Sequence, residues 1–162
     1  MYTLQYAVDI EQQAASIIDL LSDGVPQHAV SISVVLKKHQ SDAVSILSTA
    51  VREGTVSLSK AEVQISIDDQ AWQSSINDAS SSPESLVKWQ YALWAIQELY
   101  ERLFQFYIQA SRNAYSTDEK LFFSSMAEVK NVIRRRLDTV SRIISNEIWG
   151  KLGFAPFALG KE

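Results

Sequence analysis

The chain has 162 residues, of which 46% are hydrophobic and 21% are charged, a composition typical of one globular domain with a hydrophobic core. Its formal net charge of -4 is unfavourable for binding nucleic acid, which requires a basic surface. The sequence contains no cysteine, which excludes disulfides, thiolate metal sites, iron–sulfur clusters and a cysteine nucleophile.

The hydropathy pattern argues against a membrane protein. No apolar run is long enough to cross a bilayer. The N-terminus lacks the basic start and the apolar core of a signal peptide. We therefore expect a cytoplasmic protein with no membrane partner.

The first third of the chain predicts two helices that pack as an antiparallel pair. The first runs from about Thr3 to Ser22 and ends at Gly24, and the second runs from Pro26 to Glu53 and ends at Gly54. Core residues recur at intervals of three and four, which keeps them on one helix face. The first face comprises Leu4, Ala7, Glu11, Ala14, Ile18 and Leu21, and the second comprises Ile32, Leu36, His39, Ala43, Ile46 and Ala50.

Residues 55–83 break this periodicity. Residues 63–67 alternate like a short strand, and residues 68–77 have the pattern of a short amphipathic helix. So long a connection is expected to pack along the surface, with Ile65 and Trp72 as its anchors.

A second pair of helices is predicted from Ser82 to Trp149. Pro83 is suited to a first helical turn, and Ser116 with Glu119 forms a capping box. The two helices are long and joined by a short turn, so they should be antiparallel. Their apolar faces comprise Leu86, Trp89, Leu93, Ile96, Tyr100, Leu103, Tyr107 and Ala110, and then Phe122, Met126, Val129, Ile133, Leu137, Val140 and Ile144.

The C-terminal segment, residues 151–162, is expected to lie outside the helical domain of residues 1–150. Residues 150–159 are apolar and are interrupted by glycine and proline. We interpret this tail as a cover for one end of the bundle. A dimer contact or a peptide that docks on a protein partner are the alternatives. The whole order, helix pair, long crossover, helix pair, predicts an all-α, ferritin-like four-helix bundle.

Three segments of the chain resemble rubrerythrin-like proteins of the ferritin superfamily. Residues 7–14 are similar to the first helix of that family, residues 95–107 to the third and residues 120–128 to the fourth. The resemblance implies two irons in the bundle core, which react with oxygen or peroxide. It also implies a Glu from each of helices one and three and a Glu-x-x-His from each of helices two and four.

The first two helices retain only part of this ligand set. Glu11 matches the glutamate of helix one. The second helix has His39-Gln40-Ser41-Asp42, so acid and imidazole are present in reversed order. Glu11, His39 and Asp42 together offer three nitrogen and oxygen donors for a single iron, manganese or zinc ion.

The last two helices depart further from the family pattern. Tyr100 stands where helix three should carry its glutamate, and Lys130 and Ile133 stand where helix four should carry Glu-x-x-His. Glu128 lies two residues early and would have to rotate inward to act as a ligand. A di-iron site of the family type is therefore not expected, and no position in the chain has a Glu-x-x-His.

These substitutions suggest a polar core that replaces the metal site. Glu11, His39, Tyr100 and Lys130 all lie near the middle of their helices and should share one level of the bundle. We expect the Lys130 ammonium to supply the positive charge and to pair with Glu11, with no cofactor bound. If a cofactor is present, the donors favour iron or another divalent metal such as manganese or zinc.

Other chemistry-bearing residues have ordinary structural interpretations. His28 follows Pro26 and is expected on the surface, and the basic run Arg134–Arg136 is expected on a solvated helix flank. Trp89, Tyr91 and Trp94 favour packing in the core or in a dimer over ligand stacking.

The sequence identifies no catalytic residue, so whether the protein is an enzyme stays open. We expect a degenerate rubrerythrin-like bundle that acts by binding or assembly, as a homodimer without nucleic acid. One alternative is a rubrerythrin-type oxidoreductase with an altered mono- or di-metal site. Another is a helical adaptor that binds a protein partner through residues 150–159.

Overall fold

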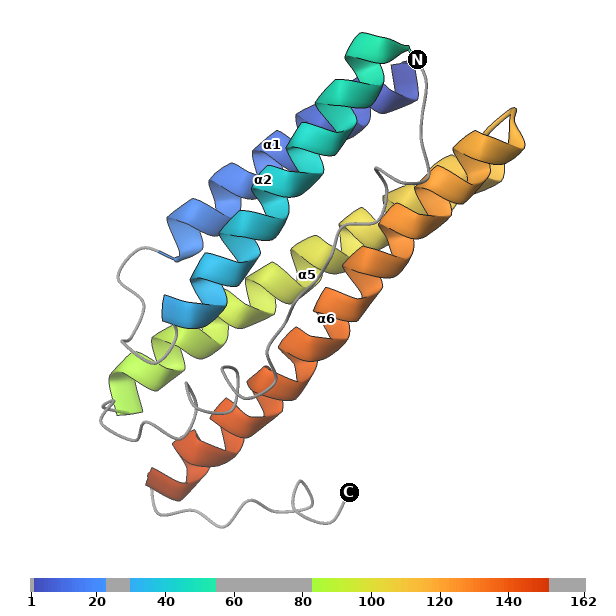
Figure 1. The fold of residues 1–162 in the computed structure, drawn as a ribbon. Coiled ribbons are helices and arrows are strands. Elements are labelled where there is room, and N and C mark those ends of the chain that lie inside the picture. Colours follow the sequence, from blue (N-terminus) through green and yellow to red (C-terminus); the bar gives the residue numbers. More distant parts are fainter. Residues whose placement is uncertain (1, 23–29, 55–82, 152–162) are drawn as a thin grey trace.

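The computed structural model describes residues 2–22, 30–54 and 83–151, and the regular structure in these ranges is entirely helical. The helices are α1 (Tyr2–Leu21), α2 (Val30–Glu53), α5 (Pro83–Asn113) and α6 (Thr117–Lys151). They form a four-helix bundle (Figure 1). The prediction of an all-α four-helix bundle is confirmed for this part of the chain. None of these helices is apolar enough over a sufficient length to cross a membrane.

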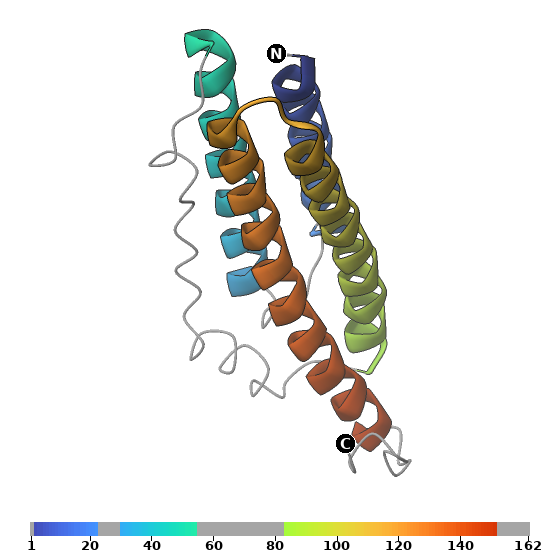
Figure 2. The same cartoon turned by 90° about the vertical axis from the view of Figure 1, so that its right-hand side faces the viewer.

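The helices pack as two antiparallel pairs, α1 with α2 and α5 with α6 (Figures 1 and 2). The last turn of α2 and the first turn of α5 lie at opposite ends of the bundle (Figure 1). The connection between them must therefore join the two ends, and α2 and α5 run in the same direction.

Several predicted features fall outside the described residues. They are the helix signals Gly24 and Pro26, the surface residue His28, the crossover 55–82 with its strand at 63–67 and its anchors Ile65 and Trp72, and the tail beyond Lys151.

Three predicted helix boundaries, one end and two starts, are confirmed by the structure. Gly54 has a φ of 71°, and its N–H donates to the carbonyl of Ala50 at 3.0 Å, so it ends α2 in the left-handed conformation. The first residue of α5 is Pro83. Ser116 Oγ accepts from the N–H of Glu119 at 3.1 Å, which caps the start of α6.

The end of α6 differs from the prediction. We expected Gly150 to open the tail, but α6 continues through it to Lys151. Gly54 is the one glycine with positive φ in the described ranges, so Gly150 adopts no helix-ending conformation. A helical glycine is less favourable than alanine by only about 1 kcal/mol, and this is too little to end a long packed helix.

The hydrophobic core consists of two clusters that meet near the middle of the bundle. One cluster lies towards the end where α5 begins and is built around Ile18, Leu36, Trp89 and Leu137. The other lies towards the end where α6 begins and includes Leu4, Leu47 and Phe122. The predicted apolar faces are largely buried, although Ile46 is only partly buried and its neighbour Leu47 is fully buried. Polar side chains lie between the two clusters.

Candidate functional site

The candidate site is a buried cluster of polar side chains between the two hydrophobic clusters. Every helix contributes to it, and each member is at most 5% exposed. We call it the polar cluster, and its members are Glu11 of α1, His39 and Gln40 of α2, Tyr100 and Tyr107 of α5, and Lys130 of α6.

Lys130 lies at the centre of the polar cluster. Its Nζ is 2.9 Å from the Glu11 carboxylate, 3.0 Å from His39 Nε2 and 3.1 Å from Gln40 Oε1. An ammonium group has three N–H donors, and three acceptors surround this one. The ammonium also lies 5.3 Å from the centre of the Tyr100 ring, within the range of a cation–π contact.

The Glu11 carboxylate is bound from three helices. Besides Lys130, it accepts from Tyr107 Oη at 2.7 Å and from Gln40 Nε2 at 2.7 Å. A buried carboxylate is strongly unfavourable unless it is paired and hydrogen-bonded, and Glu11 meets both conditions.

Gln40 links Glu11 to Tyr100 and Lys130 within the polar cluster. Its Nε2 donates to the carboxylate and, at 3.2 Å, to the backbone carbonyl of Glu11. Its Oε1 accepts from Tyr100 Oη at 3.0 Å and from Lys130 Nζ at 3.1 Å. The amide therefore uses both donors and both acceptor positions.

His39 is neutral in this environment. Burial, and secondly the charge of Lys130, lower the pKa of His39 well below its usual value of 6.5. Because Nε2 accepts from Lys130, the ring proton is assigned to Nδ1. Among the described residues Nδ1 has no hydrogen-bond partner.

The other titratable groups are held in the states that the hydrogen bonds require. Burial, followed by the charge of Glu11, raises the pKa values of Tyr100 and Tyr107 well above 10.0, so both phenols remain donors. Burial lowers the pKa of Lys130, and the charge and hydrogen bond of Glu11 oppose this shift. The ammonium of Lys130 and the carboxylate of Glu11 form an ion pair at 2.9 Å beside a neutral His39, so the charges of the polar cluster cancel.

The structure brings together the four residues of the predicted polar core, Glu11, His39, Tyr100 and Lys130, but it separates the four candidate metal ligands. Of those ligands, Glu11 and His39 are in the polar cluster. Asp42 instead bonds Lys38 at 3.1 Å with a side chain that is 43% exposed, and Glu128 is exposed on α6.

The donors that do converge do not fit a metal while Lys130 is charged. The ammonium stands where a cation bound by Glu11 and His39 would have to lie. Among the described residues, no group of three or more His, Asp or Glu side chains is arranged to hold a metal.

Two members of the polar cluster were missed by the sequence analysis. Gln40 adjoins His39 on α2, and Tyr107 lies two helical turns after Tyr100 on α5. A tyrosine within an aromatic stripe has the pattern of ordinary core packing. Its spacing of seven residues from Tyr100, which puts both on one face, was the one available signal.

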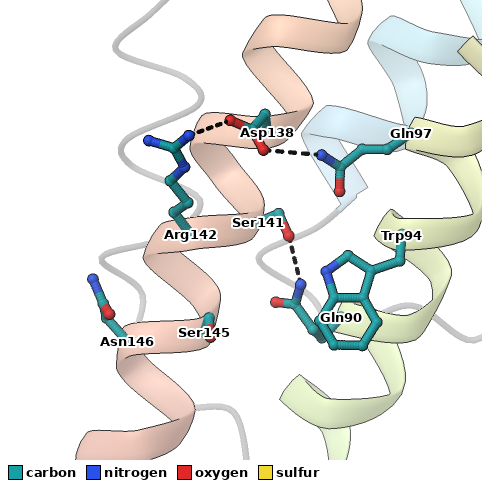
Figure 3. A pocket seen from close by; sticks show the side chains of 8 residues that line it. All are labelled: Gln90, Trp94, Gln97, Asp138, Ser141, Arg142, Ser145 and Asn146. Carbon is teal, nitrogen blue, oxygen red and sulfur yellow. Dashed lines mark hydrogen bonds and ion pairs between the residues drawn. The ribbon is translucent and has the colours of Figure 1, made fainter. Parts of the chain in front are cut away.

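A second feature is a polar surface cleft between α5 and α6, with a volume of about 430 Å³ (Figure 3). In it Asp138 accepts from Gln97 Nε2 at 3.4 Å and pairs with Arg142 at 3.0 Å, while Gln90 bonds Ser141. The remaining lining residues are Trp94, Ser145 and Asn146. No residue of the polar cluster lines it.

The aromatic residues at the start of α5 divide into two environments. Trp89 is 1% exposed and belongs to the core, whereas Tyr91 is 64% and Trp94 51% exposed. The rings of Tyr91 and Trp94 meet edge to face with centres 5.5 Å apart. Packing in the core is therefore confirmed for Trp89. Tyr91 and Trp94 lie outside the core, and packing in a dimer stays a prediction for them.

The basic run on α6 lies on the outside of the bundle, as predicted. Arg134 pairs with Glu101 at 3.0 Å and bonds Asn131 at 2.8 Å, and Arg135 and Arg136 are exposed.

The fold and the polar cluster define an all-helical bundle with a buried ion pair at its centre. No protein-family model, no curated protein and no solved structure matches the chain. The resemblance to rubrerythrin-like proteins rests on the three helix motifs alone.

Proposed function

We propose that this chain is a degenerate rubrerythrin-like, ferritin-like bundle that acts by binding or assembly and carries out no di-iron chemistry. The observation that carries this proposal is the position of Lys130. Its ammonium contacts Glu11, His39 and Gln40, and thereby occupies the point where their donor atoms converge.

The helix order supports the ferritin-like part of the proposal. Two antiparallel pairs joined by one long crossover is the connectivity of ferritin-like bundles. The end of α2 and the start of α5 lie at opposite ends of the bundle, as this connectivity requires (Figure 1). Four residues at the family's ligand positions also lie together between the two hydrophobic clusters: Glu11, His39, Tyr100 and Lys130.

Charge balance supports the loss of metal chemistry. In a di-iron site, metal ions neutralise the carboxylates that bind them. Here the family's helix-three glutamate position is Tyr100 and a helix-four ligand position is Lys130. One ammonium balances the one remaining carboxylate, so the core needs no additional cation.

The surface of α5 supports a role in binding. Tyr91 and Trp94 are large and exposed; Trp94 lines the polar cleft between α5 and α6, and the Tyr91 ring packs against Trp94. Exposed aromatic residues beside hydrogen-bonding groups are typical of the anchors in protein interfaces. We propose a homodimer or a protein complex that uses this face. The tail at residues 150–159, the docking element of the adaptor alternative, lies almost entirely outside the described residues.

The metal part of the proposal is tested by loading the wild-type protein with ferrous iron without oxygen, removing excess metal and measuring metal content. We expect no stoichiometric metal. Two irons per chain would overturn the proposal and would favour the oxidoreductase. One metal per chain, lost in Glu11→Gln, would favour an altered mono-metal site.

Assembly is tested by measuring the molar mass in solution over a range of concentrations. We expect a dimer that Trp94→Ala weakens. Tyr115, which is fully exposed in the turn before α6, provides the matched control, because Tyr115→Ala should leave the molar mass unchanged. A monomer at every concentration would reject the homodimer.

A further inference from the structure

We infer that the polar cleft between α5 and α6 binds a neutral sugar, with one face of the sugar ring stacked on Trp94. The inference rests on the binding role proposed for the surface of α5, and it deepens that role by naming a ligand class. The cleft has a volume of about 430 Å³, within the range of roughly 300–1,000 Å³ found for small-molecule sites. It therefore has room for a small ligand.

Trp94 is held in place by the side chains around it. With the amide of Gln90 assigned so that its neighbours are satisfied, Gln90 Oε1 accepts from Trp94 Nε1 at 2.6 Å, and Gln90 Nε2 donates to the Ser141 carbonyl at 3.0 Å. Gln90 and Ser141 are themselves buried. The ring of Tyr91 packs against the indole edge to face. The half-exposed indole is therefore fixed before any ligand binds, which lowers the entropic cost of binding.

The two charges in the cleft neutralise each other. Arg142 donates to the Asp138 carboxylate at 3.0 Å, and the other six lining residues carry no charge. An anion would compete with Asp138 for Arg142, and a cation would compete with Arg142 for Asp138. The chain as a whole has a net charge of -4, which further disfavours an anion. The charge distribution therefore favours a neutral ligand.

The remaining polar groups of the cleft can both donate and accept hydrogen bonds. Gln97 and Asn146 carry amides, and Ser145 carries a hydroxyl. Ser145 and Asn146 bond no other residue of the cleft, and Gln97 bonds Asp138 through Nε2 alone (Figure 3). A sugar hydroxyl likewise donates and accepts, so neighbouring hydroxyls of one ring can pair with such groups.

A sugar ring combines the two properties that the cleft requires. Its C–H groups form an apolar face that can pack on the indole of Trp94, and its hydroxyls project from the edge of the ring towards the polar groups of α5 and α6. A nucleobase also has a flat face, but its few polar groups lie in one plane. A nucleotide adds phosphates, which the balanced charges of the cleft do not attract.

The experiment titrates the wild-type protein with the neutral disaccharides maltose, cellobiose and lactose. Calorimetry measures affinity, and saturation-transfer NMR identifies the sugar protons that contact the protein. We expect at least one disaccharide to bind with a Kd of roughly 1 mM, with the strongest transfer to its ring C–H protons. The corresponding hexasaccharide separates two sources of this chemistry: equal affinity indicates a small sugar, and tighter binding indicates a segment of a longer glycan.

Variants locate the site. Trp94→Ala should weaken binding about tenfold, whereas Trp94→Phe, which keeps a flat ring, should lose less. Asn146→Ala should weaken binding about threefold through the lost hydrogen bond. Tyr115→Ala removes an exposed aromatic ring outside the cleft and should bind as the wild type. Unchanged affinity in both Trp94→Ala and Asn146→Ala would place the sugar elsewhere and overturn the inference.

Other results would also overturn it. If none of the sugars binds at about 20 times the expected Kd, the cleft is not a sugar site. Binding of adenosine without any sugar would make it a nucleobase site, and tighter binding of glucose 6-phosphate than of glucose would show that it selects an anion. Failure of the proposed assembly is distinguished by molar mass. If no sugar binds but Trp94→Ala still weakens the dimer, only the inference fails.

Discussion

Lys130 has no exposed surface, and its charge is nevertheless accommodated within the polar cluster. Removing an ammonium from water is unfavourable by several kcal/mol, and attraction to a carboxylate offsets this only where the remaining hydrogen bonds are made. All three donors of Lys130 have acceptors, and Glu11 is bound by Tyr107 and Gln40 as well. Such a network favours one register of α1 and α2 against α6, because a shift would leave buried charges without partners.

His39 should make the protein sensitive to acid. Its pKa in the folded protein lies well below the usual 6.5, because of burial and then the Lys130 charge. As the pH falls below about 6.5, the unfolded chain therefore binds a proton that the folded chain does not, and stability decreases. We expect a loss of up to about 2 kcal/mol between pH 7 and pH 5 that His39→Gln removes. Urea unfolding at several pH values measures it.

The control for this pH dependence is the second histidine, His28. The sequence predicts it on the surface, so His28→Gln should retain the wild-type pH dependence. Equal slopes for the wild type and His39→Gln would contradict a neutral His39 in the folded protein.

The composition of the polar cluster was only partly predictable. Glu11, His39 and Tyr100 lie on apolar helix faces that periodicity predicts. Lys130 was predicted only through the family resemblance, because the predicted apolar face of its helix ran through Val129. Gln40 was not predicted, because its role depends on how far α2 is rotated towards α1 and α6. Helical periodicity does not fix that rotation to within one residue.

At the scale of the helices, local signals predicted the boundaries where a specific backbone conformation or hydrogen bond is required. Gly54, Pro83 and Ser116 each end or begin a helix in the structure. Gly150 was misassigned because glycine is only weakly unfavourable within a helix and ends one only when it adopts positive φ.

Substitution by alanine should change the stability of the protein in opposite directions at Gly54 and at Gly150. A Cβ at either position meets no atom within 4 Å, so backbone conformation alone decides the effect. Gly54→Ala forces alanine to a φ of 71° and should destabilise the protein by about 1 kcal/mol. Gly150→Ala should stabilise α6 by roughly 0.5 kcal/mol.

Thermal unfolding measures both effects, since 1 kcal/mol corresponds to about 2–4 °C in Tm for a domain of this size. Destabilisation by Gly150→Ala would contradict a helical conformation at that position. A neutral Gly54→Ala would contradict the left-handed end of α2.

At the scale of the whole molecule, the bundle has two hydrophobic clusters separated by a polar layer. The number and order of the helices followed from periodicity, which is a local property of the sequence. The pairing of α1 with α2 and of α5 with α6 followed from the short turn that joins the two helices of each pair. The contacts between pairs, such as Lys130 of α6 with Glu11 of α1, depend on packing and were predicted only through the family resemblance.

The most direct test of this account is the coupling between Glu11 and Lys130, measured by urea unfolding of Glu11→Gln, Lys130→Met and the double variant. We predict that Lys130→Met alone destabilises the protein by about 3–5 kcal/mol, because it leaves Glu11 buried without a counter-ion. The double variant should lose less than the sum of the single losses, with a coupling of about 2 kcal/mol or more. The exposed pair Lys38 and Asp42 provides the control and should couple by only about 0.3–0.5 kcal/mol. A coupling between Glu11 and Lys130 no larger than this control would contradict a buried ion pair at the centre of the bundle.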